Sequence, residues 1–327
     1  MTQTHAAHTF MNQGLACINL HHRKDRTFPT TAQVDYPWKE QGKTTFQTKR
    51  NQAMTIELSK FQVDPKSKLH LKDWKTNDDE GLAREAVAPI FQENLKAISE
   101  LQYKLFADGS RGVLIVIQGI DTAGKDGVIR DVFSCMNPQG VYVKSFKKPE
   151  KIELAHDYLW RVHQACPAKG MIGVFNRSHY EDVLITRVHK WIDSKTCERR
   201  YEHINQFEKL LVDEGTAIVK LFLLISKDEQ FARLQSRIEE PQRNWKFNLA
   251  DLAERAFWND YMDAFHDALA ATSSKHAPWF VIPSDKKWFR NLLVSEIVLA
   301  QLKSLDLKWP KPAADSATLR KALNDAK

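Results

Sequence analysis

Features that mark secreted, zinc-binding and membrane-spanning proteins are scarce in this sequence. The 327 residues include only four cysteines, scattered without a CxxC pair, so neither a disulfide framework nor a zinc site is indicated. The longest apolar stretch is far shorter than the ~20 residues of a membrane-spanning helix. The first residues lack the basic and apolar regions of a secretory signal. We therefore expect a protein of the reducing cytoplasm without a membrane segment.

Positive charge, in contrast, is in excess. Lysine and arginine number 48 against 41 acidic residues, which gives a net charge of +7 with histidine neutral. An excess of this kind favours an anionic partner, such as nucleic acid, a polyphosphate or a membrane surface. Apolar residues make up 43% of the chain and charged residues 27%, as in globular proteins with a sizeable core. Charge alone does not distinguish between the three partners.

Short apolar runs alternate with helical patterns along the chain. Apolar residues at helical spacing predict a helix over 85–106, with Gly109 as its stop, and further helices over 201–211 and 252–269. Buried strands are predicted at 113–118, 141–146, 171–175, 217–225 and 279–282. The alternation predicts an α/β fold, a five-stranded parallel sheet with helices on both faces and ligands at the carboxyl ends of the strands.

The segment GIDTAGKDG at 119–127 directly follows the first predicted strand. Gly119, Gly124 and Lys125 fit the start of the pattern GxxxxGK[ST], in which backbone N–H groups and a helix N-terminus converge on phosphate oxygens. Asp126 replaces the final serine or threonine, whose hydroxyl would ligate magnesium. An alternative interpretation is a tight strand-to-helix turn that merely needs glycines. The strand before the segment and the helical pattern after it favour phosphate binding.

Two aspartates belong to this segment. Asp121 cannot cradle phosphate itself, because two anions ~4 Å apart repel by about 1 to 4 kcal/mol. A carboxylate makes sense here where Mg2+ lies between it and the phosphates, and that ion also replaces the missing hydroxyl ligand. We interpret Asp126, in the first helical turn, as a complement to the helix dipole. The sequence therefore predicts a magnesium-dependent phosphate site.

Charged residues crowd the end of the third predicted strand, in VFNRSHYEDVLITRVH at 174–189. In many enzymes with this loop, the strand end carries a second magnesium-binding acid, yet the first polar residue here is Asn176. The charged residues that follow are Arg177, Glu181, Asp182, Arg187 and His189. A solvated loop is the alternative, but the flanking apolar runs favour a functional cluster where ligands bind.

Two further segments are basic. KSFKKPEK, after the second strand, supplies either a solvated surface or the approach for a long polyanion, through Lys144, Lys147, Lys148 and Lys151. RLQSRIEEPQRNWKF at 233–247 has four basic residues around Pro241, namely Arg233, Arg237, Arg243 and Lys246. An insertion of this kind between two helices is typical of a closing lid that stabilises charge in phosphoryl transfer. An ordinary amphipathic turn is equally compatible with the pattern.

Together these segments resemble a known family. GIDTAGKDG, NPQGVYVKSFKKP, FNRSHYEDVL, EEPQRNWKF and PWFVIPSDKKWFRN look like the motif series of the family-2 polyphosphate kinases, in order from about residue 58 to 306. The resemblance implies a P-loop kinase-like three-layer sandwich with a helical lid. It also implies transfer of the terminal phosphate of inorganic polyphosphate to nucleotides with Mg2+, or with Mn2+ in its place.

The resemblance also implies roles for individual residues. Catalytic roles fall to Asp121, Lys125, Arg177 and Arg237, and metal binding to Asp121 and Glu181. Phosphate or nucleotide binding is implied for Gly119, Ala123, Gly124, Lys125, Asp126, Gly127, Asn176, Glu181, Arg187 and Arg243. Polyphosphate binding is implied for Lys144, Lys147, Lys148, Arg130 and Lys246.

One departure from the family pattern bears on the acceptor nucleotide. Some members have FDRSWYN where this chain has FNRSHYE, so Asn176 replaces the aspartate of the subclass that favours nucleoside diphosphates. The pattern is more similar to the subclass that uses AMP, or both AMP and ADP, with Glu181 carrying part of the metal's charge. We therefore expect AMP and ADP as acceptors.

A single glycine loop and the absence of internal repeats predict one catalytic unit, and not the fused two-domain form of some relatives. We expect an extension at 1–53, disordered or an artefact of a true start at Met54, and a catalytic domain at 54–310. The lid is expected at about 230–248 and a C-terminal tail at 311–327. The family resemblance implies a homo-oligomer, a dimer or tetramer, with no nucleic acid or membrane as partner.

Two other functions share parts of this pattern. An ATP-dependent small-molecule or nucleotide kinase has the same loop and lid, but the basic approach at 144–151 is larger than a compact triphosphate needs. A non-enzymatic polyanion-binding protein fits the charge, but it has no need of Asp121 and Lys125 together. The polyphosphate-dependent enzyme is the function that we expect.

Overall fold

A five-stranded, fully parallel sheet organises the fold. The computed structural model describes residues 56–65 and 69–327, all within one compact unit. The strands lie in the order β2-β3-β1-β4-β5, and their bounds are β1 Gly112–Gln118, β2 Val141–Ser145, β3 Ile172–Asn176, β4 Thr216–Leu224 and β5 Trp279–Pro283. Each strand lies within one residue of a predicted run, and the α/β class is confirmed. The predicted extension at 1–53 lies outside the described residues.

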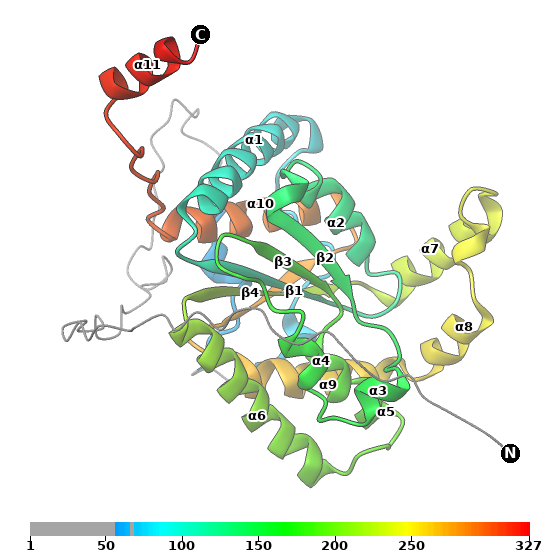
Figure 1. Ribbon diagram of the computed structural model, residues 1–327. Helices are drawn as coiled ribbons and strands as arrows, with labels where there is room; N and C mark the ends of the chain where they lie inside the picture. Colours follow the sequence, from blue (N-terminus) through cyan, green and yellow to red (C-terminus); the bar gives the residue numbers. More distant parts are fainter. Residues whose placement is uncertain (1–55, 66–68) are drawn as a thin grey trace, which may run out of the picture. The chain divides into compact units, whose positions relative to one another are not determined.

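Helices cover both faces of the sheet (Figure 1). One face carries α1 Arg84–Asp108, α2 Lys125–Phe133 and α10 Lys287–Ser304. The other carries α4 Trp160–His163, α5 Ile185–Val188, α6 Ser194–Asp213 and α9 Trp258–Thr272. The remaining α-helices are α3 Lys151–Leu154, α7 Lys227–Glu239, α8 Leu249–Ala256 and α11 Ser316–Asp325. The 3-10 turns are η1 Leu58–Phe61, η2 Leu71–Asp73, η3 Pro138–Gly140, η4 His179–Asp182 and η5 Asn244–Lys246.

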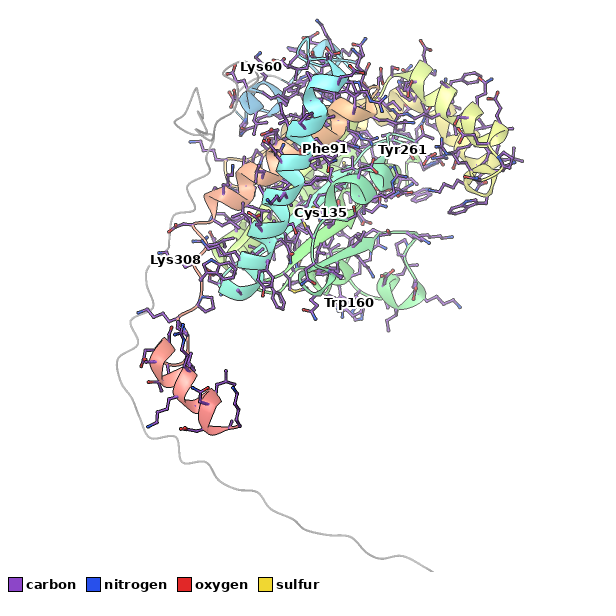
Figure 2. The ribbon with its side chains drawn as sticks, turned by 90° about the horizontal axis from the view of Figure 1, so that it is seen from above. Lys60, Phe91, Cys135, Trp160, Tyr261 and Lys308 are labelled. Carbon is purple, nitrogen blue, oxygen red and sulfur yellow. The ribbon has the colours of Figure 1, made fainter. Side chains whose placement is uncertain are left out.

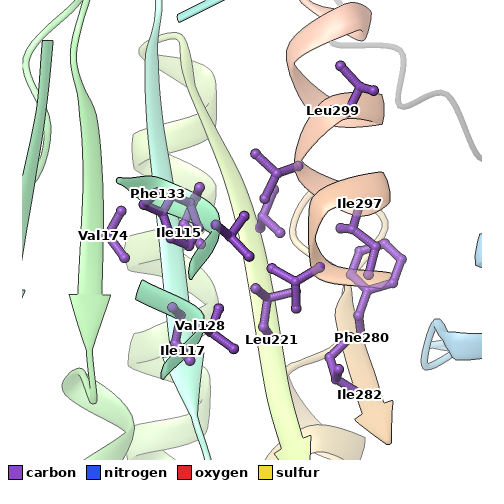
Figure 3. Packing of buried hydrophobic residues seen from close by; sticks show 14 of the residues in the cluster. Ile115, Ile117, Val128, Phe133, Val174, Leu221, Phe280, Ile282, Ile297 and Leu299 are labelled. Atoms are coloured by element: carbon purple, nitrogen blue, oxygen red, sulfur yellow. The ribbon is translucent and has the colours of Figure 1, made fainter. Parts of the chain in front are cut away.

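Burial on both faces explains the continuous apolar runs of the strands. In β1, Ile115 and Ile117 pack against α2 and α10, whereas Leu114 and Val116 belong to the core on the opposite face, as the side-chain period of two requires. Figure 3 shows the first core, in which strand residues meet Val128, Phe133, Ile297 and Leu299. Each fully buried side chain of this size contributes about 1.5–3 kcal/mol of hydrophobic stabilisation.

The first predicted helix ends at its predicted stop. Gly109 follows α1 with φ of +63° in the left-handed region, and its N–H donates to the carbonyl of Leu105 at 3.0 Å. This is a common helix termination, because glycine adopts the left-handed conformation without a Cβ penalty. The chain is thereby turned back into β1, which carries the glycine loop at its far end.

The helix predicted over 252–269 is wrong in one respect, because two helices occupy this range. α8 ends at Ala256 and α9 begins at Trp258, with Phe257 between them. Leu252 is exposed, whereas Phe265 and Leu269 of α9 are buried in the core. The helical period continues through the sequence, but α8 contributes no buried residue. Only α9 therefore packs on the sheet. We group α8 with α7 and η5 as parts of the lid region.

Two expectations remain, one for the C-terminal tail and one for membrane-spanning segments. Within the expected tail, residues 316–325 form α11, whose first turn is capped by Asp315 accepting from the N–H groups of Ala317 and Thr318. The described part of the chain has no helix whose length and apolar character would let it cross a membrane.

Candidate active site

The glycine loop joins β1 to α2, in the predicted strand–loop–helix order. Gly119 has φ of +156° and Gly124 has φ of +105°, and Lys125 is the first residue of α2. A Cβ on Gly119 would lie 2.9 Å from the carbonyl oxygen of Leu223, and one on Gly124 would lie 1.9 Å from Nη1 of Arg290. Both positions therefore require glycine, for conformation and for space.

Lys125 turns back onto the loop that precedes it. Its Nζ donates to the carbonyl oxygens of Gly119 at 2.8 Å and Ile120 at 3.2 Å. Burial, together with the nearby charge of Arg177, lowers the pKa of Lys125 to about 8. A phosphate group beside this ammonium would favour the protonated form, so the site is electrostatically prepared for an anion.

Two arginines from other elements, Arg233 and Arg290, contact the loop. Arg233 of α7 donates to the carbonyl oxygens of Thr122 at 2.9 Å and Ser284 at 2.6 Å, which joins the loop to the end of β5. Arg290 of α10, only 2% exposed, lies against Gly124. Burial lowers the pKa of Arg290 to about 10, with a further contribution from the charge of Arg233. From the sequence, Arg233 was predicted to belong to the lid. Arg290 was not predicted as a site residue, although it lies in the segment PWFVIPSDKKWFRN.

A pocket opens beside the loop, at the carboxyl ends of β1 and β3. It brings together Asp121, Arg177 and Glu181, which come from two separate motifs. The complete lining is Gly119, Ile120, Asp121, Arg177, Glu181, Leu184, Gln230, Asp251, Glu254, Arg255, Tyr261 and Phe265. Sequence reasoning missed the far wall, made by α8 and α9. Tyr261, on this wall, is labelled in Figure 2.

Arg237 of α7 links the loop to α8. Its Nη1 lies 3.2 Å from a carboxylate oxygen of Asp121 and 3.2 Å from one of Asp251. Burial opposes ionisation of Asp121, but the charges of Lys125 and Arg237 outweigh it and hold the pKa of this carboxyl below its usual value. Burial and the charge of Asp121 raise the pKa of Asp251. One guanidinium thus bridges two carboxyl groups of unequal acidity.

Arg177 and Glu181 form the second charged pair of the pocket. Nη1 of Arg177 lies 3.3 Å from Oε2 of Glu181. The backbone of Arg177 has φ of +63°, a left-handed conformation that costs a non-glycine residue about 1–2 kcal/mol. Its N–H donates to the carbonyl oxygen of Ile117 in β1 at 3.0 Å. The surrounding structure therefore has to hold this residue in place.

Asn176 and Asp126 contact each other above the start of α2. The side-chain amide of Asn176 donates to Oδ1 of Asp126 at 2.8 Å, and Nζ of Lys246 lies 3.7 Å from Oδ2. Asp126 lies in the first turn of α2, where a carboxylate complements the helix dipole. Its partners connect the end of β3 and the lid to the loop.

Several predicted binding residues lie away from this pocket. Lys144, Lys147 and Lys148 are exposed at the end of β2. Arg130 is paired with Asp131 on the surface of α2, and Arg243 is paired with Glu240. Arg187 donates to Asp267 at 2.6 Å. None of them lines the pocket. Of the smaller predicted residues, Ala123 is buried in the loop and Gly127 faces Arg290.

The acidic residues of the pocket suit a hard cation. Asp121, Glu181, Asp251 and Glu254 all line it. Within residues 56–65 and 69–327, no three acidic, histidine or cysteine side chains form a ready-made metal cluster. Magnesium typically takes only one or two carboxylates from a protein and completes its octahedron with water and substrate phosphates. The carboxylates of this pocket therefore fit the donor preference of such an ion.

Comparison with known proteins gives a matching family, related sequences and a related crystal structure. The model of the family described as polyphosphate kinase 2 (PPK2) matches residues 83–310. The chain is 45% identical over 262 residues to an AMP/ADP-polyphosphate phosphotransferase of Meiothermus ruber, covering 79% of this chain and 98% of the relative. An ADP-polyphosphate phosphotransferase of Rhodopseudomonas palustris is 42% identical over 271 residues, 79% of this chain and 94% of its own. The crystal structure of polyphosphate kinase 2 from Arthrobacter aurescens TC1 superposes with a TM-score of 0.79 at 43% identity, over 81% of this chain and 95% of that one.

Proposed function

Because this chain belongs to the polyphosphate kinase 2 family, we propose that it transfers the terminal phosphate of inorganic polyphosphate to AMP and ADP, forming ADP and ATP. The family predicted from the motif series is confirmed. The observation that carries the proposal is the pocket in which Asp121, Arg177 and Glu181 meet beside the glycine loop. The relative from M. ruber is named for both acceptors, which supports AMP as well as ADP.

The glycine loop would bind the reacting phosphates. Backbone N–H groups at the start of α2 converge there, and the ammonium of Lys125 is held at the same place by Gly119 and Ile120. The nucleophile is a terminal phosphate oxygen of AMP or ADP, so the protein needs no covalent intermediate. Its contribution is the in-line positioning of two anions and the neutralisation of their charge.

Phosphoryl-transfer enzymes generally use divalent metal ions. We propose Mg2+ for this chain, with Mn2+ as a substitute, held by Asp121 and Glu181. When bound, the ion neutralises charge on the reacting phosphates. Arg177 and Arg237 lie beside these two carboxylates, at 3.3 and 3.2 Å. Both guanidinium groups can therefore turn from a carboxylate to the phosphoryl group that is transferred.

The long donor would extend from the pocket along exposed basic residues. Lys144, Lys147 and Lys148 at the end of β2, Arg130 on α2 and Lys246 on the lid are the residues we propose for the outer part of the polyphosphate chain. Lys246 already lies 3.7 Å from Asp126 at the start of α2. Contacts of this kind act through charge and depend on salt.

The other proposals follow from the site and from the family. We propose that residues 54–310 act as one catalytic domain with the lid at 230–248, and that Arg187, Arg243 and Asn176 contact the nucleotide or its phosphates. We also propose a cytoplasmic location, which suits a substrate pair of adenine nucleotides and a chain whose described cysteines Cys135, Cys166 and Cys197 are free. A homo-oligomer remains our prediction from the family resemblance.

The test is direct. The purified protein is mixed with Mg2+ and long-chain polyphosphate, AMP or ADP is added separately, and the products are separated by chromatography. ATP from ADP, and ADP followed by ATP from AMP, is the expected result. Turnover that appears only when ATP replaces polyphosphate as donor would identify an ordinary nucleotide kinase. Salt-sensitive binding of polyphosphate without any product would identify a polyanion-binding protein.

A further inference from the structure

A lysine lies at the centre of the sheet. Lys220 belongs to β4, which pairs with β1 and β5 on either side, and its side chain is fully buried. Its ammonium group donates to Oε2 of Glu208 at 2.6 Å, to the hydroxyl of Tyr180 at 3.0 Å and to the carbonyl oxygen of Thr272 at 2.7 Å. All three N–H donors are thereby satisfied.

Glu208 of α6 completes the cluster. Its Oε1 accepts from the hydroxyl of Tyr180 at 2.8 Å and lies 3.3 Å from Nε2 of His179. None of Lys220, Glu208, His179 and Tyr180 has measurable solvent exposure. A buried ion pair of this kind is weak as a source of stability, because desolvation of both charges offsets their attraction, and apolar residues of similar volume often do as well. Stability alone therefore does not explain this cluster.

The cluster is connected to the pocket by one short segment. Ser178, His179 and Tyr180 stand between Arg177 and Glu181, so three buried residues of the segment are flanked by two that line the pocket. The N–H of Tyr180 donates to the hydroxyl of Ser178 at 3.2 Å. The neighbouring N–H of Glu181 donates to the carbonyl oxygen of Ser178 at 3.1 Å. A displacement of Tyr180 would thus be transmitted to Glu181 through one tight turn.

We propose that Lys220, Glu208, His179 and Tyr180 form a positioning cluster that holds Arg177 and Glu181 in the geometry needed for phosphoryl transfer. The inference rests on the proposed function and adds to it residues that contact neither substrate. The left-handed backbone of Arg177 supports it, because such strain persists only where the surroundings over-determine the conformation. The fixed hydrogen-bond partners of Tyr180 supply that constraint.

The test compares two variants that each remove one tyrosine hydroxyl, one inside the cluster and one outside it. Tyr180→Phe removes the hydroxyl that joins the segment to Lys220 and Glu208. The control is Tyr142→Phe in β2, which removes a hydroxyl that donates to the carbonyl oxygen of Ala165 at 2.6 Å, outside both the cluster and residues 177–181. Both substitutions leave a hydrogen-bond partner of the lost hydroxyl unsatisfied, so each should lower the melting temperature by a few degrees.

The expected result separates positioning from stability. Tyr180→Phe should lower kcat by about tenfold or more, because small misplacements of charged groups are costly in transfer reactions, while KM for AMP changes little. Tyr142→Phe should keep kcat within about twofold of the wild type despite its lower melting temperature. Unchanged kcat in soluble Tyr180→Phe, or losses in both variants that follow melting temperature, would overturn the proposal. Should Tyr180→Phe fail to fold, His179→Phe serves the same comparison.

Failure of the proposed function can be distinguished from failure of the positioning proposal. In that case the wild type itself would not turn over polyphosphate, and the ratio of variant to wild type would be measured with ATP as donor. Crystal structures of the two variants give a readout that needs no activity. Arg177 and Glu181 should shift relative to Asp121 in Tyr180→Phe but not in Tyr142→Phe, and an unshifted segment in Tyr180→Phe would refute positioning.

Discussion

Asp121 stands at the centre of the site's charges. Lys125 lies beside it in the loop, Arg237 reaches it from the lid at 3.2 Å, and both favour its ionised form. A carboxylate kept ionised in this way is a good ligand for a divalent cation and a poor neighbour for bare phosphate. The aspartate in the glycine loop is therefore best explained by an ion between acid and substrate.

Removing the negative charge of Asp121 tests this explanation. Asp121→Asn should lower kcat about a thousandfold or more, because metal binding and the orientation of Arg237 are lost together. Asp251→Asn is the matched control, since it removes the other carboxyl partner of Arg237 but leaves the loop intact, and its effect should be much smaller. Circular dichroism and melting temperature would establish that both variants fold. An active, folded Asp121→Asn protein would exclude the role.

Lys125 predicts a pH dependence. Its pKa of about 8 means that the free enzyme loses this cation as pH rises through that value, so kcat/KM for polyphosphate should decline above about pH 8. Unfolding is not the cause of this decline. Between the pKa of Lys125 in the native protein, about 8, and its higher pKa in the unfolded chain, the unfolded chain binds more protons than the native one. The contribution of Lys125 to the stability of the protein therefore rises with pH in this range. Lys125→Arg, which stays charged, should abolish the decline. A flat profile for the wild type would contradict the assignment.

At the scale of elements, the glycine loop is shaped by helices that lie far from it in sequence. Arg233 of α7 and Arg290 of α10 meet at its backbone, so the loop depends on elements that begin more than a hundred residues later. The pattern GxxxxGK predicts the loop but not these supports. Propensity and periodicity describe local structure only, and which helix ends meet at a loop is decided by tertiary packing.

Gly124 and Gly109 give a matched pair of substitutions at this scale. Both have positive φ, but a Cβ on Gly109 meets nothing within 4 Å, whereas one on Gly124 would meet Arg290. Gly109→Ala should cost about 1 kcal/mol of stability from backbone strain and keep normal turnover. Gly124→Ala should lose more stability and most of its activity. Thermal melts with parallel assays would show this, and equal effects of the two substitutions would contradict the assigned contact.

Strands were more predictable than the pocket. Residues such as Val113, Ile115 and Val174 lie in runs that are apolar on both faces, and this pattern follows directly from a sheet covered by helices. Asp251, Glu254 and Tyr261 carry no comparable signal, because their position depends on the break at Phe257, which the helical period does not register. Lys220 did carry a signal, a charge within a buried strand, but the sequence alone gives no partner for it.

At the scale of the whole molecule, the basic residues fall into two groups, those that make contacts inside the protein and those that are exposed to a substrate. Arg290 and Lys220 are buried and Arg233 is half-buried, and all three make contacts within the protein. Lys144, Lys147 and Lys148 are exposed together at one strand end. The net charge of +7 therefore understates how strongly the surface around these three lysines would select a polyanion.

Salt dependence tests this distribution. Replacing Lys144, Lys147 and Lys148 with alanine should raise KM for long-chain polyphosphate by about tenfold and reduce the slope of log KM against log salt by about two units. Replacing Lys169, Lys311 and Lys321, which are equally exposed, removes the same charge elsewhere and should leave both values near the wild type. Steady-state kinetics at several salt concentrations gives both numbers. Equal effects of the two triple substitutions would place polyphosphate elsewhere.

β4 has a consequence before the protein is folded. Its nine residues, TAIVKLFLL, are all buried in the native sheet and carry a single charge, Lys220. In a nascent or refolding chain this stretch is exposed, and apolar segments with high β-propensity associate with one another unless a charge interrupts them. Lys220→Met should accordingly reduce the yield of soluble protein on refolding from denaturant, measured by light scattering. We therefore expect the lysine of the proposed positioning cluster to oppose aggregation as well, while the sheet is being assembled.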